Sequence, residues 1–124
     1  MRANGLIIAA GGLFGLFGVI LSARATHGGD GPQLMVAAQF LLFHAPVFFG
    51  IAALRSQAIS LRFMSLGAGL LAFGLALFCG DLTVRALLMR PIFPFAAPSG
   101  GFLLIVGWLA LLSAGLMLTS SRKS

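Results

Sequence analysis

The strongest constraint on the fold of this 124-residue chain is a set of four apolar stretches, each about as long as a bilayer is thick. They cover residues 5–23, 34–54, 63–81 and 101–119, and their only charged side chain is Asp81, at the end of the third. A transmembrane helix needs about 20 consecutive apolar residues, so each stretch is long enough to span. We therefore expect an all-α integral membrane protein in which residues 1–124 form a single domain, a bundle of four transmembrane helices.

The composition indicates that lipid, not water, covers most of the surface. Charged residues make up only 8% of the chain, whereas soluble domains carry about 25%. The formal charge of +6 does not predict nucleic-acid binding, because the arginines stand singly between apolar runs and form no basic face. The lone Cys79 excludes an intrachain disulfide and belongs to no metal-ligand cluster. The sequence predicts no metal site, no cofactor and no nucleic-acid partner.

The residues that flank the stretches indicate where the helices begin and end. A signal peptide is the alternative for the first stretch, since residues 23–25 resemble a cleavage site. The apolar run is longer than a typical signal-peptide core, which favours a retained helix. The third helix covers residues 63–81, and it can extend to about residue 89, because Asp81 and Arg85 lie one turn apart and can pair. Three prolines within residues 90–98 then interrupt helical bonding, and Ser99 is the expected N-cap of the fourth helix.

Four spans place both chain termini on the same side of the membrane, and the basic residues predict which side this is. The side of the termini is expected to carry five basic residues, which are Arg2, Arg55, Arg62, Arg122 and Lys123. The other side is expected to carry three, which are Arg24, Arg85 and Arg90. Positive residues collect on the cytoplasmic side of membrane proteins. We therefore expect an N-in, C-in, multi-pass protein of the cell inner membrane.

Small residues are expected to bring the helices together, because burial from water does not drive association inside a bilayer. Three of the four stretches carry small residues spaced so that they share a helix face. These are Gly11, Gly15 and Gly18 in the first stretch, Gly67 and Gly74 in the third, and Gly107, Ala110 and Ala114 in the fourth. The second stretch is instead rich in phenylalanine, and Pro46 is expected to kink it. A tight antiparallel bundle is the expected result.

His44 is the one polar group near the bilayer midplane that requires an explanation. It lies about ten residues from either end of its stretch, and an uncompensated polar group at that depth is costly. It is therefore expected to face the bundle interior and to have a partner. It could serve as a ligand, a proton acceptor or a quinone contact. The alternative, which we favour, is a neutral imidazole that holds two helices together through a hydrogen bond.

Other polar residues are candidates for a site near the outer end of the spans. Gln39 is expected to make an interhelical hydrogen bond, Asp81 to pair with Arg85, and His27 to lie in an interfacial loop. The alternative is an outward-facing polar pocket that combines Gln39, Asp81, His27, Asp30 and the start of the fourth helix at residues 99–101. His27 and His44 differ in depth by roughly 15 Å at 1.5 Å per residue, so they cannot share one haem iron.

Several short motifs, in order along the chain, resemble those of a known family. Residues 26–28 (Thr-His-Gly) look like its Ala-His-Gly, and residues 40–45 (Phe-Leu-Leu-Phe-His-Ala) look like its Tyr-x-x-Tyr-His-Ala. Residues 78–82 (Phe-Cys-Gly-Asp-Leu) are similar to its Phe-Ser-Gly-Ser-Leu, and residues 98–101 and 107–108 match its Pro-x-Gly-Gly and Gly-Trp. The chain thus resembles the domain-of-unknown-function 423 family, small membrane proteins related to transmembrane protein 256. The resemblance implies a four-helix membrane protein and no assigned activity.

The sequence contains no catalytic set, so we expect a protein that is not an enzyme. With hardly any mass outside the membrane, it is expected to contact the bilayer and to act as an accessory or structural subunit. Such a subunit would dock on a larger membrane complex, for example a respiratory enzyme, or associate with itself. The alternative is a small-molecule, quinone or proton-handling protein centred on His44 and Asp81.

Overall fold

The computed structural model describes residues 1–57 and 61–121, and within them the chain forms four α-helices and no strand. The helices are α1 (Arg2–His27), α2 (Pro32–Ser56), α3 (Leu61–Leu88) and α4 (Ala96–Ser121). Each is long and apolar enough to cross a membrane. Even α2, with 25 residues, is about 37 Å long, which exceeds the hydrocarbon core of a bilayer, about 30 Å. The predicted all-α, four-helix, multi-pass architecture is confirmed.

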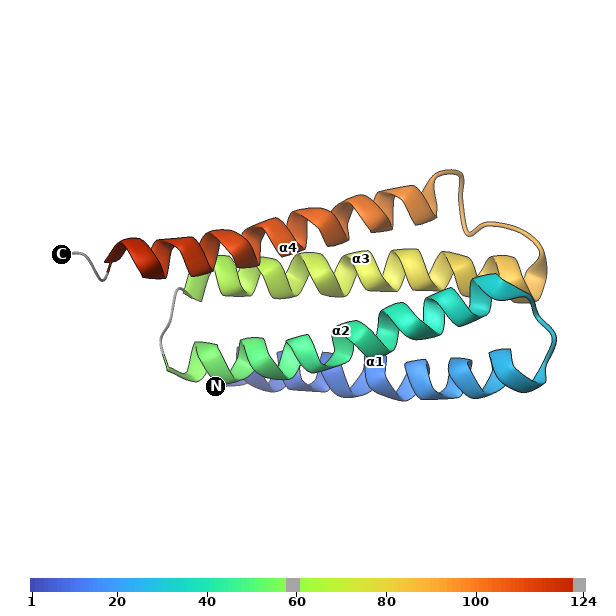
Figure 1. The fold of residues 1–124 in the computed structure, drawn as a ribbon, viewed down its shortest axis with the longest axis horizontal. Helices are drawn as coiled ribbons and strands as arrows, with labels where there is room; N and C mark the ends of the chain where they lie inside the picture. Colours follow the sequence, from blue (N-terminus) through green and yellow to red (C-terminus); the bar gives the residue numbers. More distant parts are fainter. Residues whose placement is uncertain (58–60, 122–124) are drawn as a thin grey trace.

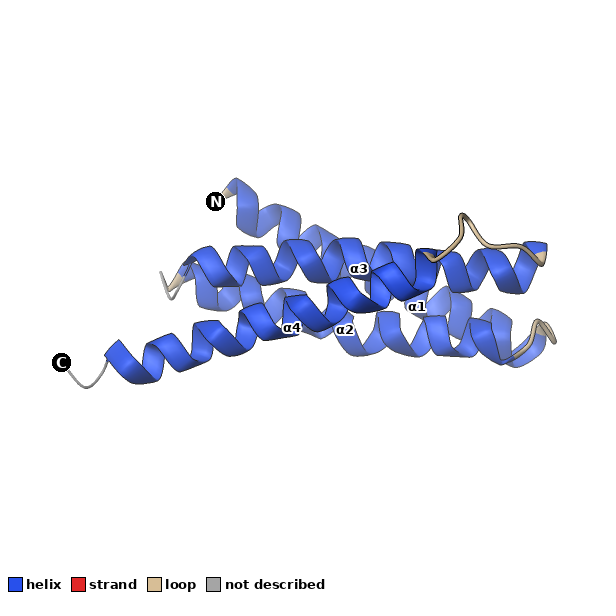
Figure 2. Ribbon diagram, turned by 90° about the horizontal axis from the view of Figure 1, so that it is seen from above, coloured by secondary structure: helices blue, strands red, loops and turns tan. Residues whose placement is uncertain are grey.

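The four helices run along one long axis, and their connections lie at its two ends (Figures 1 and 2). The beginning of α1 and the end of α4 lie at the same end, here called the terminal end. The short connections at residues 28–31 and 89–95 lie at the other end, here called the loop end. Both termini therefore belong to one side of the membrane, as an even number of spans requires.

The end of α3 follows the extended alternative that the sequence allows, whereas the start of α4 differs from the predicted one. Helix α3 continues past Asp81 to Leu88, and the chain then turns at Met89, which has a positive φ of 60°. Helix α4 already begins at Ala96, so the prediction of Ser99 as its N-cap is wrong. Proline is accepted in a first helical turn because the N–H it lacks would have no helical partner there. Pro98 therefore lies within the first turn of α4 and does not delay its start.

The helices pack mainly with their neighbours in sequence: α1 with α2, α2 with α3, and α3 with α4. The core consists chiefly of buried side chains of α2 and α3, joined by Leu104 and Ala114 of α4. Helix α1 buries only Gly11 and Gly18. The bundle is therefore less closed than the sequence predicts, because α1 and α3 leave an open groove between them.

The predicted glycine seams mostly lie where helices meet. A Cβ added at Gly11 would lie 3.0 Å from the Phe48 Cβ, and one at Gly18 would lie 2.8 Å from the Leu42 side chain, so α1 approaches α2 closely. Gly15 is less tightly packed, since its added Cβ would lie 3.6 Å from the nearest atom.

Between α3 and α4, three glycines allow a similar approach, namely Gly67, Gly74 and Gly107. The tightest position is one that the sequence did not single out for packing. An added Cβ at Gly100 would lie 2.5 Å from the Phe78 backbone nitrogen.

Helix α2 changes direction near its middle (Figure 1), as Pro46 predicts. Its phenylalanines divide between two environments. Phe48 is buried in the core and Phe40 is half-buried, whereas Phe43 and Phe49 are exposed. The aromatic face expected on this helix is thus partly core and partly surface.

Candidate functional site

His44 lies in the middle of α2, is only 8% exposed, and uses both ring nitrogens. Its Nδ1 is 2.7 Å from the carbonyl oxygen of Phe40, which can only accept, so Nδ1 carries the proton and donates it. Its Nε2 lies 3.1 Å from the indole Nε1–H of Trp108 in α4 and therefore accepts. A neutral imidazole protonated on Nδ1 is the form that satisfies both contacts.

Aromatic rings surround this imidazole. The Phe40 ring is stacked on it with centroids 5.8 Å apart, and the Trp108 ring is tilted against it at 5.7 Å. Trp108 is itself 46% exposed, so it closes the His44 position from the outside of the bundle. The bond joins α2 to α4, two helices that are not neighbours in sequence. This arrangement agrees with the expectation that a neutral His44 joins two helices through a hydrogen bond. The sequence did not identify Trp108 as the partner.

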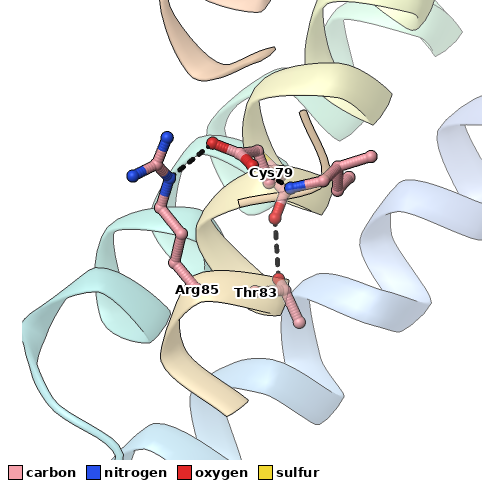
Figure 3. A network of polar contacts seen from close by, with 5 residues as sticks. Cys79, Thr83 and Arg85 are labelled. Carbon is pink, nitrogen blue, oxygen red and sulfur yellow. Dashed lines mark hydrogen bonds and ion pairs between the residues drawn. The ribbon is translucent and has the colours of Figure 1, made fainter. Parts of the chain in front are cut away.

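Asp81 is the second polar group in the interior, and its side chain is fully buried. The predicted pair is present, because Arg85 Nε donates a hydrogen bond to Asp81 Oδ2 at 2.7 Å (Figure 3). The other oxygen, Oδ1, accepts the backbone N–H of Ile92 at 2.8 Å. Asp81 therefore fastens the 89–95 connection to α3.

The hydroxyl of Thr83 does not join the Asp81 contacts. It donates to the Cys79 carbonyl at 2.7 Å (Figure 3), a local bond within α3. Cys79 itself is buried. Among the described residues, no three His, Cys, Asp or Glu side chains gather in a way that could hold a metal ion.

The predicted outward-facing pocket is not assembled as proposed. Gln39 is exposed, and His27, the last residue of α1, is exposed as well. The prediction of an interhelical bond from Gln39 is therefore wrong, because rotation about the α2 axis turns this side chain away from the neighbouring helices. Asp30 pairs with Arg24 instead, with Oδ2 2.6 Å from Nε. The hydrogen bond from Arg24 holds the pKa of Asp30 below its usual value.

A different recess exists at the loop end, with a volume of about 420 Å³. It lies between the 28–31 connection and the end of α3, and its charged lining residues are Asp30, Arg85 and Arg90. Asp30 is the one residue of the predicted pocket that takes part in it. Asp81 and residues 99–101 do not line it.

A third polar cluster, which the sequence did not predict, lies at the terminal end. Arg55, in the last turn of α2, donates from Nε to the Asn4 side-chain oxygen of α1 at 2.9 Å. Its Nη1 donates to the hydroxyl of Ser65 in α3. One guanidinium thus joins three helices. The sequence offered no signal for this, because Asn4 and Ser65 are 51 and 10 residues away from Arg55 along the chain.

This cluster lies at one end of the groove between α1 and α3, here called the α1–α3 groove. Its part near the terminal end has a volume of about 370 Å³ and is lined by Arg55, Ser65 and apolar residues of all three helices, among them Leu6, Ile7, Phe48 and Ala72. Its continuation has a volume of about 520 Å³ and lies between residues 13–21 of α1 and 75–84 of α3. Leu41 and Phe48 of α2 line these two parts, so α2 forms the floor of the groove.

Comparison with known proteins adds a family and no activity. The family described as "Protein of unknown function (DUF423)" matches residues 8–101, well over half of the chain. The matched range includes His27, His44, Asp81 and the packing glycines up to Gly100. No solved structure matches the chain.

Proposed function

The chain belongs to the DUF423 family, and on the geometry above we propose that it is a non-enzymatic accessory subunit that docks within the bilayer on a larger membrane complex. A respiratory enzyme is one class of complex that fits, since such enzymes offer large lipid-embedded surfaces. The observation that carries the proposal is the exposure of α1, whose only buried residues are Gly11 and Gly18. Among the described helices, α1 buries the fewest residues of its hydrophobic window.

The polar groups of the interior support a structural role. Both nitrogens of His44 and both oxygens of Asp81 are used in contacts within the chain. None of the three recesses described above is lined by either residue. A quinone, substrate or proton carrier acting at His44 would first have to displace Trp108 or Phe40. The geometry therefore favours an accessory role over the alternative centred on His44 and Asp81.

The outward face of α1 is the surface we propose for docking. Gly5 and Gly12 lie seven residues apart on it, and a Cβ added at either would meet nothing within 4 Å. Ala9, between them, is also exposed. Such small residues allow the backbone of a second helix to approach closely, which is how helices associate in lipid. Gly11 and Gly18, by contrast, are already occupied by α2.

We further propose that the protein lies in the cell inner membrane with both termini in the cytoplasm. The support is the excess of basic residues expected on the side of the termini, five against three. Within the described part, Arg2, Arg55 and Arg62 fall at the terminal end and Arg24, Arg85 and Arg90 at the loop end.

The docking proposal is tested by extracting the tagged protein from its native membrane in polymer-bounded nanodiscs and identifying what co-purifies. The unmodified protein is expected to bring down one larger membrane complex in fixed stoichiometry. Gly12→Leu is expected to abolish this recovery without unfolding the bundle, because a Cβ added at Gly12 meets nothing within 4 Å. Gly115→Leu, at an equally open glycine of α4, is the matched control and should retain the complex. Recovery of only the free protein, in the unmodified form, would refute the accessory role.

A further inference from the structure

The α1–α3 groove is apolar along its length and has a positively charged side chain at one end. The proposed docking function does not use this feature. In its part near the terminal end, the polar lining residues are Arg55 and Ser65, and the rest of the lining is apolar. Arg55 lies at the end of α2, in the last turn, where a spanning helix meets the headgroup region. The groove therefore runs from the membrane interface into the hydrocarbon core.

Neither acidic side chain of the protein pairs with Arg55. The sequence contains two acidic residues. Both lie toward the loop end, where Asp30 pairs with Arg24 and Asp81 with Arg85. Asn4 and Ser65 hold the Arg55 guanidinium in place through Nε and Nη1, and both are neutral acceptors. A guanidinium has five N–H donors, so three remain for a ligand after these two bonds.

We infer that the α1–α3 groove binds an anionic phospholipid, with its phosphate on Arg55 and an acyl chain along Leu6, Ile7, Phe48 and Ala72. Hydrogen bonds from an arginine to a phosphate are charge-assisted and among the strongest in proteins. The two parts of the groove follow one another along α1 and α3, so a chain longer than the first part continues into the second. The lipid would also seal the side of the bundle that α1 and α3 leave open.

The size of the groove favours an acyl chain over a partner helix. The part near the terminal end extends along residues 3–10 of α1, and its volume is about 370 Å³. A partner helix is about 10 Å across. An extended hydrocarbon chain is much thinner and fits within a groove of this volume.

Lipid retention measured by native mass spectrometry tests this inference. The protein, stripped of lipid in detergent, is titrated with phosphatidylglycerol, which is anionic, and with phosphatidylcholine, which has no net charge. One phosphatidylglycerol is expected to bind per chain, at least about tenfold more tightly than phosphatidylcholine, because the choline group of phosphatidylcholine carries a positive charge that opposes binding next to Arg55.

Three variants separate the phosphate contact from the acyl contact. Arg55→Gln is expected to remove the preference for phosphatidylglycerol. Gly69→Leu should weaken binding while leaving Arg55 in place, because Gly69 lines the groove and an added Cβ there meets nothing within 4 Å. Arg62→Gln removes the same charge from an exposed position outside the groove lining and should leave binding unchanged.

Two results would overturn the inference. One is equal loss of binding in Arg55→Gln and Arg62→Gln, which would mean that only the overall charge matters. The other is displacement of phosphatidylglycerol by millimolar inorganic phosphate together with unaltered binding to Gly69→Leu, which would mean that the site takes a free phosphate and no acyl chain.

Discussion

At the scale of single residues, His44 and Asp81 show how this chain supports polar groups inside a membrane. Each is placed against donors or acceptors that use both of its polar atoms. The Asp81–Arg85 pair could be predicted because its members lie four residues apart on one helix. The partner of His44 could not, because Trp108 is 64 residues away. Its position depends on how α2 and α4 are rotated about their own axes, and the misplacement of Gln39 has the same cause.

The His44–Trp108 bond yields a prediction for stability. Trp108→Phe removes the indole donor and should lower the free energy of unfolding in mixed micelles by about 1 kcal/mol, the usual size for an interhelical hydrogen bond in membranes. His44→Leu breaks the same bond from the other side. The double variant should therefore cost less than the two single changes combined, and the difference isolates the bond from changes in packing. Purely additive costs would show that the two side chains are not coupled.

At the scale of helices, the hydropathy pattern was sufficient to predict the number of helices and roughly where they lie. The sequence predicts too late a start for α4, because it treats Pro98 as an interruption of helical hydrogen bonding. In the structure, Pro98 lies within the first turn of α4. The glycine spacing predicted the seams between α1 and α2 and between α3 and α4, since small residues on one face permit close approach. It could not predict that α1 and α3 stay apart, because this depends on how α1 and α3 lie across α2.

The seam between α3 and α4 predicts a difference between two glycines of the same helix. Gly100→Ala places a methyl group 2.5 Å from the Phe78 backbone nitrogen, so one helix has to move. We expect a loss of about 1–3 kcal/mol in unfolding free energy, the usual cost of overpacking. Gly115→Ala adds the same methyl group at a position with nothing within 4 Å and should be close to neutral. Equal stabilities of the two variants, measured by thermal unfolding in detergent, would rule out the close approach at Gly100.

At the scale of the whole molecule, glycine seams hold the bundle together, and its lateral surfaces are open to lipid or protein. The orientation proposed from the basic residues predicts a specific outcome. A fluorescent protein that matures only in the cytoplasm, fused after residue 124, should be bright. An alkaline phosphatase fused at the same place should be inactive. The reverse pattern would place both termini outside and would also move Arg55 to the outer leaflet.

Site-specific photo-crosslinking in the native membrane tests the accessory role. A photoreactive amino acid is placed at Gly12, on the outward face of α1, and in a second variant at Gly115 of α4, which is equally open. Illumination is expected to join the Gly12 variant to one larger membrane protein, whereas the Gly115 variant should give lipid adducts alone. Lipid adducts alone at Gly12 as well would contradict docking through α1.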